Sequence, residues 1–206
     1  MRTPAVLLCL ALVGLTAACG SSNHNAAPPP ATTTAPTTTS AGSAQGAGAL
    51  QAESLSAATG DIPDNQNFVV FADAGAGYSM KYPEGWAQSG GGKLVVIRDK
   101  NNIVRVVVRP GPLPTAAVVR RELAALRGVT VQSAPAAYAL PSGRSLKVVY
   151  STQSAPNAVT GKRVTLVVDR YYLAHNGKVA IVDLGTPQGV DNVDAYRLMI
   201  KSFRWR

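Results

Sequence analysis

The chain has 206 residues, of which 46% are apolar and 15% charged, and its formal net charge is +9. All twelve aromatic residues lie at Phe68 or later, and the chain from Asp61 onward holds 19 basic and 10 acidic residues. These numbers predict one folded domain, spanning 61–206, that can bury a core without disulfide bonds or a structural metal, and they exclude a small disulfide-dependent scaffold.

The first twenty residues have the pattern of a bacterial secretion signal. A short positive start at Met1 and Arg2 precedes an apolar run over 4–15, which is too short to span a membrane. Cys19 stands where the bacterial lipoprotein signal, the lipobox, places the sulfur that receives a diacylglycerol. We expect a signal peptide over 1–18 and a lipid anchor on Cys19 that holds the chain at the extracytoplasmic side of the cell membrane. Plain secretion, with cleavage near Cys19, stays open as the alternative.

Residues 19–60 have the composition of a tether. They are mostly Ala, Thr, Ser, Gly, Pro, Asn and Gln, with Glu53 as the single charged residue among them. Such a segment cannot offset the entropy of ordering its backbone, so we predict a disordered spacer. Threonines beside prolines resemble the O-glycosylated sites of mucin-like stalks, and an unmodified linker is an equal alternative.

The domain is predicted to begin with strands and to alternate between strands and helices. A helix capped by Thr115 is expected over 116–127, with Val119, Leu123 and Leu126 on its buried face, and a final helix is expected after Asp191. Alternating apolar and polar residues predict strands at 67–71, 78–82, 93–98, 103–109, 143–150, 162–173 and 178–184. This order lacks a repeating βαβ pattern, so the predicted fold is α+β, with helices packed on an antiparallel sheet.

One hairpin entry carries a family resemblance. The segment Gly77 to Trp86, GYSMKYPEGW, is similar to a motif of the PsbP-like superfamily. Together with the lipobox, the tether and the closing helix, it resembles the mycobacterial lipoproteins of LpqN/LpqT type. The resemblance implies an α/β/α sandwich and a binding or assembly module, and it implies no catalytic residue. We expect Tyr82 and Trp86 to anchor the core or the turn.

The sequence does not predict a catalytic centre. His175 is expected on a hairpin tip and no Gly-x-Ser-x-Gly elbow presents a serine to it, so we interpret it as a solvated turn residue. Asp169 and Asp183 lie on neighbouring predicted strands, and we expect each to pair with a nearby Arg or Lys and not with the other as an acid pair. With no Cys and one His in the domain, we expect neither a metal nor another cofactor.

The basic excess is the feature most suggestive of a partner. Arginines suit recognition of carboxylates and phosphates, and the candidate anion-binding residues are Arg105, Arg109, Arg120, Arg121 and Arg127, to which Arg204 and Arg206 could add. Outside the membrane the abundant anions are phospholipid heads and acidic wall polymers, and nucleic acid is out of reach. Charges that merely keep the domain soluble are an equal interpretation.

Three functions are therefore open. The first is a lipid-anchored, non-enzymatic module that binds an anionic envelope component or a partner protein. The second is a carrier of a small apolar ligand held between sheet and helix, which would need a pocket there. The third is an envelope hydrolase, which would need His175 or an acid pair in a cleft.

Overall fold

A computed structural model of the chain describes residues 59–157 and 159–206. The predicted signal peptide, Cys19 and nearly all of the predicted tether lie outside the described residues. None of the helices in these ranges is long and apolar enough to cross a membrane. The elements in chain order are β1 (Phe68–Asp73), β2 (Tyr78–Pro83), β3 (Ala87–Gly91), β4 (Leu94–Asp99), β5 (Asn102–Pro110), α2 (Ala116–Ala124), β6 (Thr130–Leu140), β7 (Gly143–Gln153), β8 (Thr165–His175), β9 (Lys178–Pro187), α3 (Val193–Ser202) and β10 (Arg204–Trp205).

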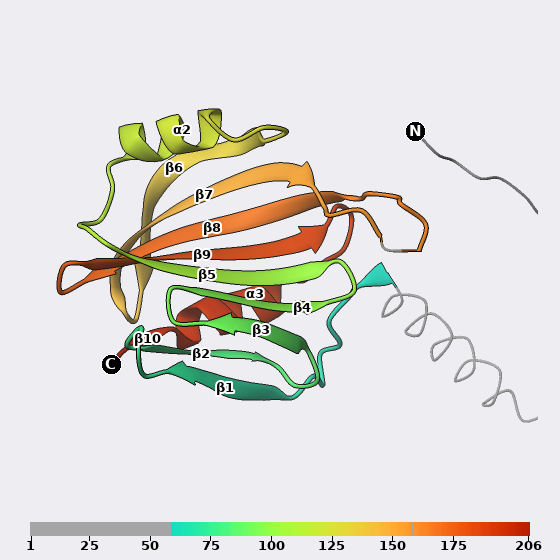
Figure 1. Ribbon diagram of the computed structural model, residues 1–206, viewed down its shortest axis with the longest axis horizontal. Helices are drawn as coiled ribbons and strands as arrows, with labels where there is room; N and C mark the ends of the chain where they lie inside the picture. The colour runs from blue at the N-terminus through green and yellow to red at the C-terminus, as the bar shows by residue number, and fades with distance from the viewer. Residues whose placement is uncertain (1–58, 158) are drawn as a thin grey trace, which may run out of the picture. The chain divides into compact units, whose positions relative to one another are not determined.

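Two antiparallel sheets form the domain (Figure 1). The larger has seven strands in the order β3-β4-β5-β9-β8-β7-β6, and the smaller has the order β1-β2-β10. Every strand pairing within them is antiparallel. The predicted α+β class with an antiparallel sheet is confirmed.

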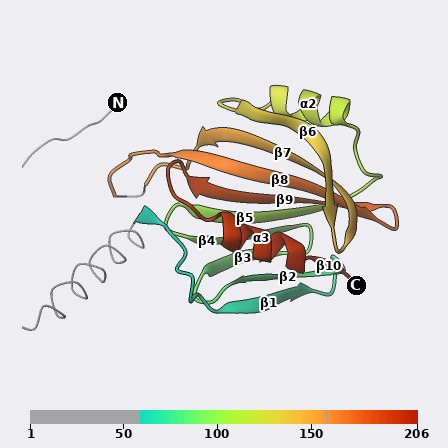
Figure 2. The same cartoon turned by 180° about the vertical axis from the view of Figure 1, so that it is seen from behind.

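The large sheet is buried on both faces, as alternation along β5 shows. Val104, Val106 and Val108 enter one apolar cluster, which also contains residues of α3 and β2. Ile103 and Val107, on the other face, pack against a second cluster that α2 completes. Side chains alternate across a strand, so the two helices cover opposite faces of the sheet, and α3 lies in front of it when the domain is seen from behind (Figure 2). This is the predicted sandwich.

The first helix is shorter than predicted. Thr115 is its N-cap and accepts a hydrogen bond from the Val118 N–H, but α2 ends at Ala124. Val119 and Leu123 are buried as expected, whereas Leu126 is 44% exposed, so its placement on the buried face is wrong. The chain has to turn here to enter β6, and Gly128 with its φ of +69° lies in that turn.

The other boundaries agree with the prediction to within a few residues, with three omissions: β3, β6 and the two-residue β10. β3 and β6 were not predicted, and both are exposed strands at the edges of the large sheet. The N-cap of α3 is Asn192, and Asp191 accepts a hydrogen bond from the Val193 N–H just outside it. Tyr82 and Trp86 are half-buried against the core, as expected of anchoring residues.

Candidate anion-binding site

A basic groove opens where the end of α3 meets the smaller sheet. Its volume is about 530 Å³. Of the described residues that line it, four are basic and none is acidic, the basic ones being Lys81, Lys201, Arg204 and Arg206. We call this hollow the α3 groove.

The fold brings these four cations together from distant parts of the chain. Arg204 of β10 lies opposite Ser79 of β2. Arg206 follows just beyond β10, where its backbone N–H donates to the Gly77 carbonyl at 2.9 Å, and both arginines line the groove. The backbone N–H of Lys81 donates to the Ser202 hydroxyl at 2.8 Å, which fastens β2 to the last turn of α3. The groove therefore depends on the pairing of β10 with β2.

Three of the four cations are available to a ligand. No Asp or Glu side chain within the described part of the chain lies within ion-pair distance of Lys81, Lys201 or Arg206. Arg204 is partly engaged, because its guanidinium donates to the carbonyls of Lys201 and Phe203, each at 2.7 Å. It caps the carbonyl end of α3, which favours positive charge.

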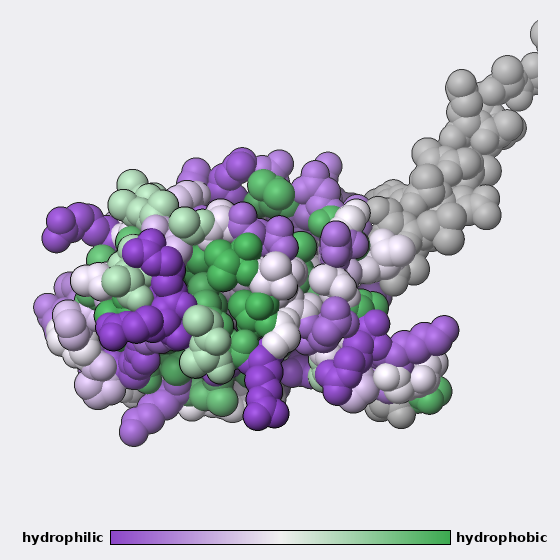
Figure 3. Space-filling model, turned by 90° about the horizontal axis from the view of Figure 1, so that it is seen from above, coloured by the Kyte–Doolittle hydropathy of each residue, from purple (hydrophilic) through white to green (hydrophobic). Residues whose placement is uncertain are grey.

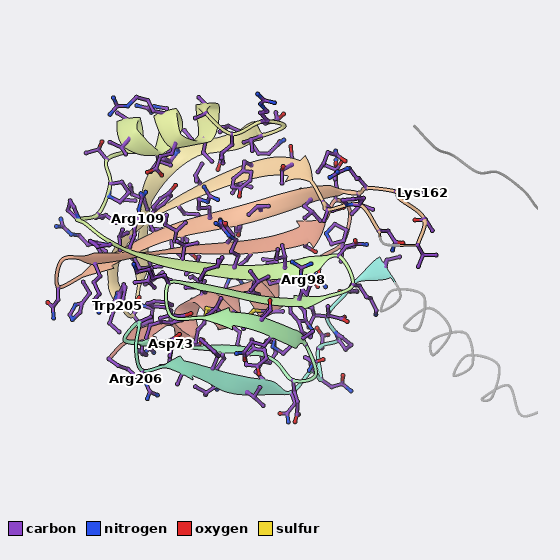
Figure 4. All side chains as sticks on the ribbon, viewed as in Figure 1. Asp73, Arg98, Arg109, Lys162, Trp205 and Arg206 are labelled. Carbon is purple, nitrogen blue, oxygen red and sulfur yellow. The ribbon has the colours of Figure 1, made fainter. Side chains whose placement is uncertain are left out.

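A second basic hollow, which we call the hairpin pocket, lies beside the groove. It measures about 190 Å³, and its basic lining residues are Lys93, Arg109 and Lys178. Gly77 lies near one lining residue of each hollow: a Cβ built there would lie 3.4 Å from the backbone oxygen of Arg206 and 3.8 Å from Lys178 Nζ. Figure 4 shows Arg109, Trp205 and Arg206 toward the same end of the domain.

The opposite end of α3 is acidic. A cleft of about 770 Å³ is lined there by four aspartates, Asp61, Asp64, Asp191 and Asp194, together with apolar and amide side chains. The described chain begins at this end, and the chain terminates at the other (Figure 1). Acids at the N-terminus of α3 and bases at its C-terminus both complement the helix dipole, so the domain is electrically polarised along this helix.

Two of the predicted anion-binding residues are held by carboxylates of the chain itself. Arg105 lies 3.2 Å from Asp183, and Arg109 lies 2.6 Å from Glu122 of α2. Both side chains are about two-fifths exposed. Their charges are partly neutralised before any ligand arrives.

The other three, Arg120, Arg121 and Arg127, are exposed on and just after α2, and no ion pair joins them to the described residues. The face seen from above mixes hydrophobic and hydrophilic residues (Figure 3). Unlike the four cations of the α3 groove, these three arginines line none of the principal hollows of the described residues.

The titratable side chains that sequence analysis examined for catalysis have structural partners. His175 ends β8, where its ring stacks on Trp205 with 6.1 Å between centroids. Asp169 pairs with Lys147 at 2.7 Å and accepts a hydrogen bond from Tyr171. In the described ranges no group of three or more His, Cys, Asp or Glu residues is arranged to hold a metal ion.

Asp183 belongs to a charged row across the face that α2 covers. Arg170 donates to its two carboxylate oxygens at 2.6 and 2.9 Å, and to the Tyr150 hydroxyl at 3.1 Å. Desolvation lowers the pKa of Arg170, but the hydrogen bonds and charge of Asp183 outweigh it and raise that pKa overall. Burial, with a smaller contribution from Asp183, raises the pKa of Tyr150. These hydrogen bonds hold Arg170 and Tyr150 in one arrangement around Asp183.

Sequence analysis named Arg204 and Arg206 but missed that Lys81 and Lys201 join them. The alternation of Lys81 with Met80 and Tyr82 marks it as solvent-facing, and Lys201 lies on the exposed side of the final helix. Neither pattern indicates that β10, only two residues long, adds to the edge of β2. That pairing is tertiary information.

No protein-family model matches the chain, and no curated protein sequence matches it. Solved structures that are similar include cyanobacterial PsbP (CyanoP) of Synechocystis sp. PCC 6803, at 17% identity and a TM-score of 0.47, covering 71% of this chain and 98% of that one. The Ran-binding protein Mog1p of Saccharomyces cerevisiae is 9% identical, with a TM-score of 0.43, and covers 68% and 96%.

A third similar structure is LpqN, involved in cell envelope biogenesis of Mycobacterium tuberculosis, at 14% identity and a TM-score of 0.38, covering 70% of this chain and 87% of that one. PsbP-like proteins are thus among the similar structures, as the hairpin motif implies, and the assignment to LpqN type is weak at this identity. These likenesses concern the fold, and at TM-scores below 0.5 they carry no argument about a ligand.

Proposed function

We propose that the chain is a non-enzymatic binding module, held at the extracytoplasmic face of the membrane by a lipid on Cys19, whose α3 groove binds an anionic component of the envelope. The observation that carries the proposal is the set of four cations around one hollow with no acidic residue in its described lining. Guanidinium and ammonium groups so arranged suit phosphate or carboxylate ligands.

The environment of the candidate catalytic groups supports a non-enzymatic function. A general base must reach the nucleophile it activates, whereas His175 stacks on an indole ring and has no serine, threonine or tyrosine hydroxyl among its described partners. The carboxylates of Asp169 and Asp183 are each committed to a cation. An acid pair of the kind a glycosidase uses would need both carboxylates in one cleft.

The carrier of a small apolar ligand finds no support in the layer between α2 and the sheet. Val119 and Leu123 fill this layer and are at most 1% exposed, against Val148 and Tyr172. The principal hollows of the described residues lie elsewhere and open to the surface.

The groove is tested with a soluble polyanion. The chain from position 19, carrying Cys19→Ser so that no lipid contributes, is titrated with inorganic polyphosphate at increasing salt. We expect binding that weakens as salt rises, since screening reduces attraction between exposed charges. The triple variant Lys81→Gln, Lys201→Gln and Arg206→Gln should lose most of the affinity, because it removes three of the four cations of the groove. Arg204 is kept because it caps the carbonyl end of α3.

The matched control is the triple variant Arg120→Gln, Arg121→Gln and Arg127→Gln, which removes the same charge from the α2 side. It should bind nearly as well as the parent chain. A larger loss in the control than in the groove variant would assign the site to the α2 arginines, and salt-independent or absent binding of the parent would end the proposal.

The anchor is tested separately in the producing cell. Cys19→Ala should move the protein from the membrane fraction to the medium, because no lipid can then be attached. Retention of the Cys19→Ala protein in the membrane fraction would contradict a lipid anchor at this cysteine.

A further inference from the structure

We infer that the basic end of the domain, made of the α3 groove and the hairpin pocket, docks onto the surface of an anionic lipid bilayer. This inference rests on the proposed anion-binding function and specifies its partner. It is drawn from three features that a soluble polyanion alone would not require: apolar side chains beside the cations, the closeness of the two hollows, and the polarised charge of the domain.

Apolar side chains stand directly among the cations of the α3 groove. Val70 of β1 lies opposite Lys81 of β2 and is 57% exposed, and Leu198 of α3 lines the same groove and is 42% exposed. A surface that presents exposed apolar groups next to lysine and arginine suits a bilayer interface, where apolar groups enter the headgroup boundary while the cations meet lipid phosphates.

The two hollows offer these cations as one surface. Gly77 lies near one residue of each hollow, the Arg206 backbone oxygen and Lys178 Nζ, so the two groups of cations are close enough for one extended surface to meet both. The lining of the pocket is otherwise largely apolar, with Ala76, Val108 and Pro110. An extended, flat anionic partner would engage both hollows, whereas a single small anion would need only one.

The acidic cleft sets the orientation. Its four aspartates lie at the N-terminal end of α3, and the groove lies at the C-terminal end, so an anionic surface attracts the groove end more than the cleft end. Asp73 is an acidic residue of the groove end, where the Ala76 and Gly92 N–H groups bind its carboxylate. The chain enters at the acidic end, through Gly60 and Ile62. About forty residues separate Gly60 from Cys19 in the sequence.

The test measures binding to vesicles of phosphatidylcholine alone or with one third phosphatidylglycerol, using the chain from position 19 with Cys19→Ser. Binding should require phosphatidylglycerol. Each basic side chain near such a surface contributes roughly a fivefold change in partition, so Lys93→Gln with Lys178→Gln should weaken binding about 25-fold. Val70→Ser with Leu198→Ser should weaken it as well, at unchanged net charge.

Two controls separate docking from general charge. The triple variant of Arg120, Arg121 and Arg127 to Gln should bind vesicles within about threefold of the parent. In a Trp86→Phe variant, Trp205 is the single tryptophan. Its emission should shift to the blue when phosphatidylglycerol vesicles are added, because its ring stacks on His175, which lies opposite Lys178 of the hairpin pocket.

The outcomes distinguish this inference from the proposed function. Polyphosphate binding by the groove without any vesicle binding overturns the docking and leaves the proposed function standing. Vesicle binding that the hairpin-pocket and apolar variants do not weaken also overturns it, since the groove would then act as a simple charge site. If the parent chain binds neither polyphosphate nor vesicles, the proposed function is contradicted as well.

Discussion

We predict that Asp183→Asn destabilises the domain far more than Arg105→Gln, which removes the more exposed partner of Asp183. The Arg170 side chain is 9% exposed, and it donates two hydrogen bonds to the Asp183 carboxylate. The substitution therefore leaves a buried guanidinium without a counter-charge. Removing one partner of a buried pair costs about 3–5 kcal/mol, and the retained amide oxygen places this case near the lower figure. About 3 kcal/mol corresponds to a fall in Tm of roughly 10 °C for a domain of this size.

Urea unfolding followed by circular dichroism measures this difference. The midpoint should fall while the slope with denaturant stays constant, since the folded surface is unchanged. Arg105→Gln is the control, because Arg105 contacts the same carboxylate but is 40% exposed, and it should cost less than about 1 kcal/mol. Equal, small losses in the two variants would refute the view that burial decides the value of this row.

Three further substitutions test other parts of the fold. Hydrogen bonds from the Ala76 N–H and other backbone N–H groups lower the pKa of Asp73, so the charged carboxylate stabilises the fold above its unfolded pKa of about 4. Asp73→Asn should therefore cost more stability at pH 7 than at pH 3, and an equal loss at both pH values in urea titrations would contradict this. Leu123→Ala should cost about 3 kcal/mol by thermal unfolding and Leu126→Ala under 0.5 kcal/mol, because only the first is buried. Asn192→Ala should cost about 2 kcal/mol and should speed hydrogen exchange at the Ile62 N–H, which donates to the Asn192 side chain. Unchanged exchange at Ile62 would be inconsistent with this hydrogen bond.

The sequence predicted the elements whose burial follows a simple period. Val104, Val106 and Val108 alternate with half-exposed residues, and Val119 and Leu123 recur at helical spacing, so β5 and α2 were found from pattern alone. The strands β3 and β6 were missed because they are edge strands: β3 is exposed throughout and carries two glycines, and β6 is interrupted by two register shifts. Neither has an alternating apolar face to reveal it.

The candidate site was predicted only in part, for a similar reason. Sequence analysis recognised the arginine excess, and it expected Asp183 to pair with a cation. It could not assign Arg105 and Arg109 their carboxylate partners, which come from β9 and α2, 78 and 13 residues away along the chain. Nor could it join Lys81 to Arg204, because cross-strand register between distant segments is set by packing.

The buried Asn192 side chain has a mechanical consequence. It accepts a hydrogen bond from the Ile62 N–H and donates to the Gly60 carbonyl, which fixes the start of the described chain to the beginning of α3 before β1 is reached. Tension applied from upstream is therefore resisted first by this amide and its neighbours. The edge strand β1 stays unloaded until they yield, so a pull on the N-terminal side would not begin by peeling the small sheet apart.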